Sequence, residues 1–130
     1  MADPLTLVQN AYGAFGRGDI PALLQMLTDD VRWQFVGDRN APYTATVVGH
    51  GQVGEWFGSV AASDDIQAFE PRQFLAGANH VTVIGWERSI AKPSGKPFEC
   101  EWVHVWRIRD GRISSFWGMY DTAPVAAARA

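Results

Sequence analysis

Residues 97–122 read PFECEWVHVWRIRDGRISSFWGMYDT, two runs of β-branched and aromatic residues joined by Asp110-Gly111. An Asp-Gly pair between two such runs is a strong signal for a β-hairpin with a two-residue turn, which pairs Arg109 with Arg112. Side chains alternate across a strand, so this register predicts which residues share one face of the hairpin. That face carries Trp102, His104, Trp106, Trp117 and Met119, with Asp121 at its end.

The opposite face of the hairpin is also apolar at its centre. It receives Val103, Val105, Phe116 and Tyr120 in the same register. No other segment of the chain remains to cover these side chains, and an uncovered apolar face favours self-association. We therefore expect a homodimer that forms through this face.

A second turn places the preceding strand. Pro93-Ser94-Gly95 fits a three-residue loop closed by a left-handed glycine. This loop puts Trp86 opposite Trp102 and adds a further tryptophan to the His104 face. A register shifted by one residue puts Glu87 there in place of Trp86.

The rest of the chain places helices before a series of strands. Asp3-Pro4 and Asp19 are typical helix starts, followed by apolar residues at helical spacing. The periodicity predicts helices over 5–15, 19–27 and 53–60, strands over 31–35, 66–75, 80–91, 97–109 and 112–122, a loop over 37–51 and a frayed tail over 123–130. Such segregation predicts a single α+β domain over 1–130, with the helices packed on one face of a curved, mainly antiparallel sheet.

Composition excludes several classes of function. The 130 residues carry a net charge of −3, which does not suit binding to a phosphate backbone, so we expect no nucleic-acid partner. The start of the chain lacks the features of a signal peptide, and no apolar run approaches the ~20 residues that span a bilayer. With a single cysteine, Cys100, the chain is expected to be a cytoplasmic protein without a membrane partner.

Cofactor and metal sites are also not indicated. The histidines at positions 50, 80 and 104 and the lone cysteine have no metal-ligand spacing. The Gly16-Arg17-Gly18 turn lacks the rest of a dinucleotide- or phosphate-binding motif. We therefore expect neither a metal nor a cofactor.

The aromatic content is the feature that points to a ligand. Six Trp, seven Phe and three Tyr make up 12% of the chain. Tryptophan is a costly way to fill a core, because its buried N–H needs a partner. We expect a concave pocket for an apolar, cyclic or aromatic small molecule, with Trp33, Phe35 and Trp56 lining its helix and loop sides.

Three segments together carry a resemblance to a known family. Residues 16–33 (GRGDIPALLQMLTDDVRW), residues 49–57 (GHGQVGEWF) and the hairpin resemble the SnoaL-like polyketide cyclase branch of the nuclear transport factor 2-like superfamily. The resemblance implies a cone in which three helices pack against a strongly bent sheet, with a pocket between them, and commonly a homodimer. The superfamily includes polyketide cyclases, ketosteroid isomerases, epoxide hydrolases, dehydratases and non-catalytic modules, so fold alone does not give the chemistry.

The resemblance also suggests roles for two residues. Asp121 matches the position of the general base in the polyketide cyclases, and His104 matches a hydrogen-bond donor of the ketosteroid isomerases. The isomerase base, however, falls at Phe35, which disfavours steroid isomerisation. The leading hypothesis is a cofactor-free enzyme that transfers protons next to a carbonyl group, with Asp121 as base and His104 as the group that orients the substrate or stabilises the oxyanion.

Each role has a structural alternative. Asp121 is equally suited to cap the end of the chain, and His104 to be a core histidine with its hydrogen bonds satisfied. The alternative function is accordingly a non-catalytic ligand-binding or dimeric association domain with the same fold.

Overall fold

The Asp110-Gly111 hairpin forms the middle of a six-stranded sheet in the computed structural model, which describes residues 3–130. The strand order is β2-β1-β6-β5-β4-β3, and every neighbouring pair is antiparallel except β1 and β6. The strands are β1 (Leu27–Val36), β2 (Ala45–Val48), β3 (Asp64–Ala76), β4 (His80–Ala91), β5 (Lys96–Arg109) and β6 (Arg112–Tyr120). The helices are α1 (Pro4–Gly16), α2 (Ile20–Gln25), α3 (His50–Ser63) and α4 (Thr122–Arg129).

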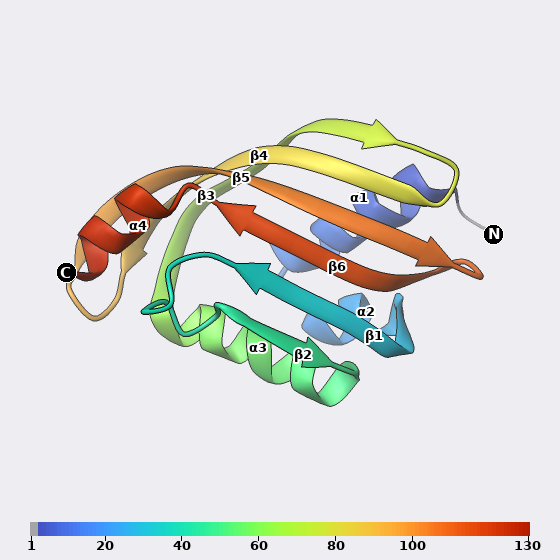
Figure 1. The fold of residues 1–130 in the computed structure, drawn as a ribbon, viewed down its shortest axis with the longest axis horizontal. Helices are drawn as coiled ribbons and strands as arrows, with labels where there is room; N and C mark the ends of the chain where they lie inside the picture. The colour runs from blue at the N-terminus through green and yellow to red at the C-terminus, as the bar shows by residue number, and fades with distance from the viewer. Residues whose placement is uncertain (1–2) are drawn as a thin grey trace.

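The sheet bends over three of the helices. Figure 1 shows α1, α2 and α3 along the inner side of the curved strands, and α4 at the end of the sheet where β6 finishes. The predicted α+β architecture is therefore confirmed. No helix within residues 3–130 has both the length and the apolar character that crossing a bilayer demands.

Local capping accounts for where the first two helices begin. The Asp3 carboxylate accepts a hydrogen bond from the Thr6 amide over 2.7 Å, and Asp19 accepts one from the Ala22 amide over 3.2 Å. Both caps satisfy amides that a helix start leaves without partners. The apolar stripe of α1 is then buried against the sheet through Leu7, Val8, Ala11 and Ala14.

The predicted register of the β5–β6 hairpin was wrong beyond its first two pairs. Arg109 pairs with Arg112 and Ile108 with Ile113, but Arg107 then pairs with Ser115. Ser114 is therefore an extra residue in β6, a β-bulge, and its hydroxyl donates to the Arg107 carbonyl over 3.3 Å. Such an insertion moves every later side chain of the strand to the opposite face of the sheet.

This inversion exchanges the two faces of β6. Phe116 and Tyr120 are buried under the sheet, whereas Trp117 and Met119 lie on its outer face. Packing explains the preference. Gly118 lies opposite His104, and a Cβ at Gly118 would come within 2.7 Å of the Phe35 ring. The position opposite His104 therefore has no room for the side chain of a tryptophan or methionine.

The β4–β5 loop also differs from the prediction. It contains four residues, so Ala91 pairs with Lys96, and the amide of Gly95 donates to the Ala91 carbonyl over 2.8 Å. The longer loop turns Trp86 to the outer face, where it lies 5.0 Å from the Arg72 guanidinium, and turns Glu87 inward. Gly85 then lies opposite Trp102, and a Cβ there would come within 2.2 Å of the indole.

Two segments predicted to be irregular are ordered. The predicted loop over 37–51 contains β2, which pairs with β1, and the predicted frayed tail forms α4. Val125 and Ala128 of α4 are buried, and Ser94 donates to the Ala128 carbonyl over 2.6 Å. The tail therefore packs against the end of the sheet.

Candidate functional site

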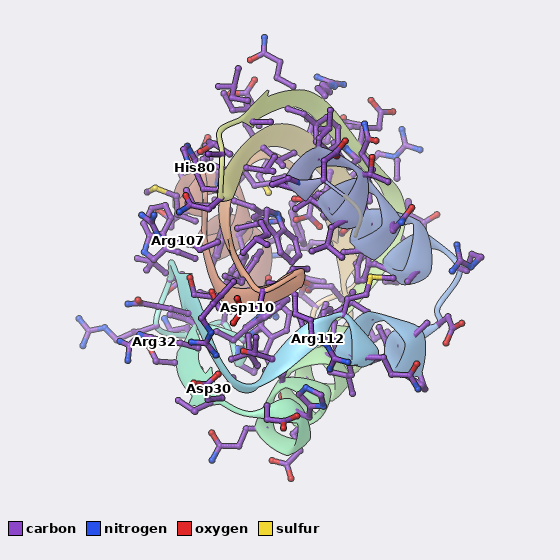
Figure 2. All side chains as sticks on the ribbon, turned by 90° about the vertical axis from the view of Figure 1, so that its right-hand side faces the viewer. Asp30, Arg32, His80, Arg107, Asp110 and Arg112 are labelled. Carbon is purple, nitrogen blue, oxygen red and sulfur yellow. The ribbon has the colours of Figure 1, made fainter. Side chains whose placement is uncertain are left out.

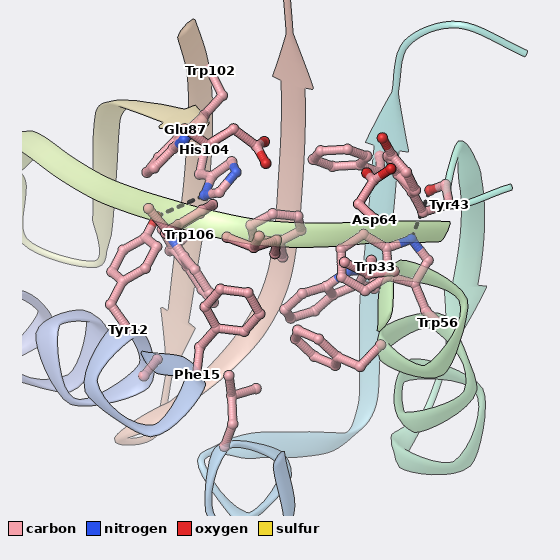
Figure 3. Close-up of a pocket in the computed structure, with 18 residues that line it drawn as sticks. Tyr12, Phe15, Trp33, Tyr43, Trp56, Asp64, Glu87, Trp102, His104 and Trp106 are labelled. Carbon is pink, nitrogen blue, oxygen red and sulfur yellow. Dashed lines mark hydrogen bonds between the residues drawn. The ribbon is translucent and has the colours of Figure 1, made fainter. Parts of the chain in front are cut away.

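A pocket lies between α1, α3 and the inner face of the sheet (Figure 3). Its cavity volume is about 70 Å³, enough for several waters. Aromatic side chains make up most of its wall. Among the predicted ligand-binding and catalytic residues, those that line it are Trp33, Phe35, Trp56, Trp102, His104 and Trp106.

The other four predicted site residues lie outside the pocket. Trp86, Trp117 and Met119 point to the outer face because of the two register shifts described above. Asp121 is exposed and caps α4, where its carboxylate accepts a hydrogen bond from the Ala123 amide over 3.4 Å. The predicted position of Asp121 on the pocket face was therefore wrong.

His104 is held among flat rings. Its imidazole stacks on Trp102 with ring centroids 4.0 Å apart, and the edge of Phe116 meets it at 4.8 Å. The ring of Tyr12, on α1, is parallel to it within 9° at 5.9 Å. A wall of this kind favours a planar or cyclic apolar ligand through stacking and dispersion.

A chain of hydrogen bonds fixes the protonation of His104. Trp106 Nε1–H donates to the Tyr12 hydroxyl oxygen over 3.0 Å, and this oxygen lies 2.7 Å from His104 Nδ1. The Tyr12 proton has no other acceptor within residues 3–130, so it is donated to Nδ1. His104 Nδ1 is then an acceptor, and the single imidazole proton resides on Nε2.

The imidazole stays neutral across the working pH range. Burial lowers the pKa of His104 to about 3, because the charged form would lose its hydration. Nε2 has no hydrogen-bond partner in the part of the chain that the structure describes, and Figure 3 shows it turned away from Tyr12 toward the interior of the pocket. His104 therefore presents a neutral N–H donor to whatever occupies the pocket.

Glu87 supplies a carboxyl group to the same pocket. Its Oε2 accepts a hydrogen bond from the Ser89 hydroxyl over 2.8 Å, and Cys100 Sγ lies 3.8 Å from Oε1. Burial raises the pKa of Glu87, and the nearby charge of Asp64 raises it further. A raised pKa makes this carboxylate a stronger base than that of an exposed glutamate.

A buried ion pair closes one end of the pocket. Arg129 of α4 donates to the Asp64 carboxylate at the start of β3, and both side chains are more than nine-tenths buried. Arg129 also donates to the Tyr43 hydroxyl over 3.3 Å, while Trp56 Nε1–H donates to the Tyr43 carbonyl over 2.7 Å. Because its charge is engaged by Arg129, Asp64 is a wall of the pocket rather than a free base.

Two further donors in the pocket wall have no protein acceptor. Trp33 Nε1 and Trp102 Nε1 are buried and unpartnered among the described residues. Buried N–H groups are normally paired, so these two are exceptions within the pocket wall. Residues 3–130 contain no group of three or more His, Cys, Asp or Glu side chains placed to hold a metal ion.

Tyr12, Asp64 and Arg129 were not among the predicted site residues. Tyr12 occupies the apolar stripe of α1, and its hydroxyl group is the only sign that it has a polar partner. Glu87 was the stated alternative to Trp86 for the position facing the pocket, and the structure places Glu87 there. Asp64 and Arg129 are 65 residues apart, and no local pattern links them.

Comparisons with known proteins agree with this architecture. The model of the SnoaL-like domain matches residues 8–116. An NTF2-like protein of unknown function from Burkholderia pseudomallei K96243 is 31% identical, with 98% of each chain covered and a TM-score of 0.85. An NTF2-like protein from Burkholderia xenovorans LB400 is 27% identical, with 98% of each chain covered and a TM-score of 0.87.

A third structure, TerC co-crystallized with polyporic acid, shares the fold with a TM-score of 0.85 at 22% identity, again over 98% of both chains. None of the curated proteins compared with the chain matches it. The family match spans most of the chain, and the structures share its helix and strand arrangement over nearly its full length. The protein belongs to the SnoaL-like domain family.

Proposed function

We propose that the pocket binds an apolar cyclic or aromatic carbonyl compound and catalyses proton transfer at the carbon next to the carbonyl group, without a cofactor. The observation that carries the proposal is the Trp106–Tyr12–His104 hydrogen-bond chain. It leaves a neutral Nε2–H donor inside an aromatic cavity, where a carbonyl oxygen is the complementary group. Such a donor gains strength because the site excludes water.

Glu87 is the base in this proposal. Its carboxylate removes a proton from the α-carbon, and the electrons of the C–H bond move to the carbonyl oxygen to form an enolate. His104 Nε2–H stabilises that oxygen with a hydrogen bond. Glu87 then returns the proton to the same or another carbon, so no oxidant, reductant or metal takes part.

This assignment moves the role of base from Asp121 to Glu87. Asp121 is exposed beside α4, whereas Glu87 points into the pocket that contains His104 (Figure 3). The raised pKa of Glu87 also suits a group that must accept a proton and release it again.

The comparison with TerC supports a small-molecule ligand, since a protein of the same fold was co-crystallized with polyporic acid. The alternative function is binding without catalysis. It is supported by the largely apolar wall of the pocket and by the single carboxyl group, Glu87, that is free of an ion pair there. The two functions differ in whether Glu87 moves a proton.

Hydrogen–deuterium exchange separates the two functions. Acetophenone in D₂O carries exchangeable protons next to its carbonyl group, and ¹H NMR follows their loss. We expect the wild type to accelerate this exchange, and Glu87→Gln to abolish the acceleration while acetophenone still binds in a calorimetric titration. Binding without accelerated exchange supports the non-catalytic alternative, and no binding of acetophenone contradicts the proposed function.

We also propose a homodimer through the outer face of the sheet. The expected interface was wrong in part, since Phe116 and Tyr120 are buried under the sheet. The apolar centre of the outer face instead comprises Val103, Val105, Trp117 and Met119, and Met119 is 42% exposed.

The charges on this face are complementary to a second copy. A cross-strand row at the hairpin end carries Arg32, Arg107 and His80 (Figure 2). The opposite end of β5 carries Glu101 and Glu99, and Glu99 lies opposite Arg88 of β4. A partner whose strands run antiparallel places the acidic end of each copy against the basic end of the other.

Sedimentation equilibrium tests this interface. Val105→Asp, which puts a charge in its apolar centre, should give monomers. Arg107→Glu should weaken the dimer more at low salt than at high salt, while Arg17→Glu at the end of α1 serves as the charge-matched control. A fully dimeric Val105→Asp variant rejects the interface.

A further inference from the structure

A second hollow opens beside the pocket, between the end of α1 and the first half of β3. It is an open groove of about 440 Å³, much larger than the space inside the pocket. Gln67 is an extra residue in β3, and the bulge bends the strand along the groove. The other side of the groove is formed by the last turn of α1, which ends at Gly16.

The groove and the pocket share one wall. Tyr12, Phe15, Ile66 and Phe69 line both of them. The Phe15 and Phe69 rings meet edge to face with centroids 5.1 Å apart, and Tyr12 lies 6.3 Å from Phe69. These rings form the boundary between the pocket and the groove, so a ligand that occupies both has to pass beside them.

The chemistry of the groove restricts what it can hold. Tyr12 is the single ionisable side chain among its lining residues, and its hydroxyl is already engaged by His104. The end of α1 adds the partial negative charge of a helix C-terminus. Gln67 contributes an amide. No lining residue is a cation, and Arg17, between the lining residues Gly16 and Gly18, directs its guanidinium toward Gly13. An uncharged group therefore fits this surface better than a carboxylate or phosphate.

We infer that the ligand has two parts: a carbonyl-bearing ring that occupies the pocket beside His104, and an uncharged extension that passes Phe15 and Phe69 and lies in the groove between α1 and β3. The inference rests on the proposed function, since it specifies the substrate class of the same site. It makes the groove a specificity subsite that selects extended neutral compounds over short or anionic ones.

Two glycines allow a matched test. A Cβ at Gly16, in the groove, meets nothing within 4 Å, and neither does a Cβ at Gly58 on the exposed face of α3. Gly16→Phe therefore adds an aromatic ring beside the groove at a position where the Cβ is free of contacts, and Gly58→Phe is the control for adding the same side chain to a helix. The probes are acetophenone, 4-butylacetophenone and 4-(4-acetylphenyl)butanoate, titrated calorimetrically.

We expect 4-butylacetophenone to bind the wild type at least about tenfold more tightly than acetophenone, because its methylene groups are buried in the groove. The butanoate should show no such gain. The ratio of the two ketones' dissociation constants should fall toward one in Gly16→Phe and stay at its wild-type value in Gly58→Phe.

The outcomes separate this inference from the proposed function. If acetophenone binds but the butyl chain brings no gain, or if the gain survives in Gly16→Phe, the groove subsite is rejected and the pocket assignment stands. An equal gain from the butanoate also rejects it. If neither ketone binds the wild type, both the inference and the proposed function are overturned.

Discussion

Acidification should destabilise the protein in part through the buried imidazole of His104. The folded-state pKa of His104 is about 3, while its ordinary value is 6.5. At a pH between these two values, His104 is protonated in the unfolded chain and neutral in the folded chain. Between these values the stability falls as the pH falls, by about 1.4 kcal/mol per pH unit. From pH 7.5 to pH 5 the loss from this residue is about 2 kcal/mol.

The comparison with His104→Gln isolates this loss. Glutamine offers an acceptor to the Tyr12 hydroxyl and does not titrate, while the other histidines and carboxylates are common to both proteins. Urea unfolding at pH 7.5, 6.5, 5.5 and 5 should show the wild type losing about 2 kcal/mol more than the variant. Equal losses in the two proteins would refute the buried neutral imidazole.

Three further variants test the network around the pocket by urea unfolding. Arg129→Met leaves Asp64 buried and unpaired, so it should cost about 3–5 kcal/mol, and most of this should return in the double variant with Asp64→Leu. Tyr12→Phe removes the hydroxyl between a buried indole and a buried imidazole and should cost about 2–4 kcal/mol; a cost near zero contradicts the hydrogen-bond chain. The raised pKa of Glu87 means that the wild type loses stability as the pH rises through it, so Glu87→Gln should become relatively more stable from pH 5 to pH 8, and a constant difference contradicts this.

The sequence predicts the architecture because its strongest signals are local. The Asp110-Gly111 turn and the alternation within β5 place Trp102, His104 and Trp106 on one face, and this holds whichever residues β6 presents. Asp3 and Asp19 likewise cap helices through contacts only three residues away. Signals of this kind do not depend on the rest of the fold.

The errors arise where one residue decides the face of a strand. Ser114 is a single insertion in β6, and it exchanges Trp117 for Phe116 on the inner side of the sheet. The sequence offers no local reason for this bulge. The reason is tertiary, since Gly118 rather than a large residue has to face Phe35.

The site itself depends on contacts that are distant along the chain. The hydrogen bond between Tyr12 and His104 joins residues that are 92 positions apart, and no periodic pattern in the sequence predicts it. The Ala-rich sequence of the tail is typical of a frayed end. The ion pair between Arg129 and Asp64, which holds the tail in place, forms only in the folded protein. His104 and five aromatic residues of the wall could be predicted, whereas Tyr12 and the Asp64–Arg129 pair could not, because their contacts exist only in the folded protein.

The protonation of His104 in solution tests the central claim most directly. A long-range ¹H–¹⁵N correlation spectrum at neutral pH, with His104→Gln to assign the signals, reports which ring nitrogen carries the proton. We expect a proton on Nε2, an unprotonated Nδ1, no titration above pH 5, and a shift of the Nε2 signal when acetophenone is added. A proton on Nδ1, or titration near pH 6.5, would contradict it.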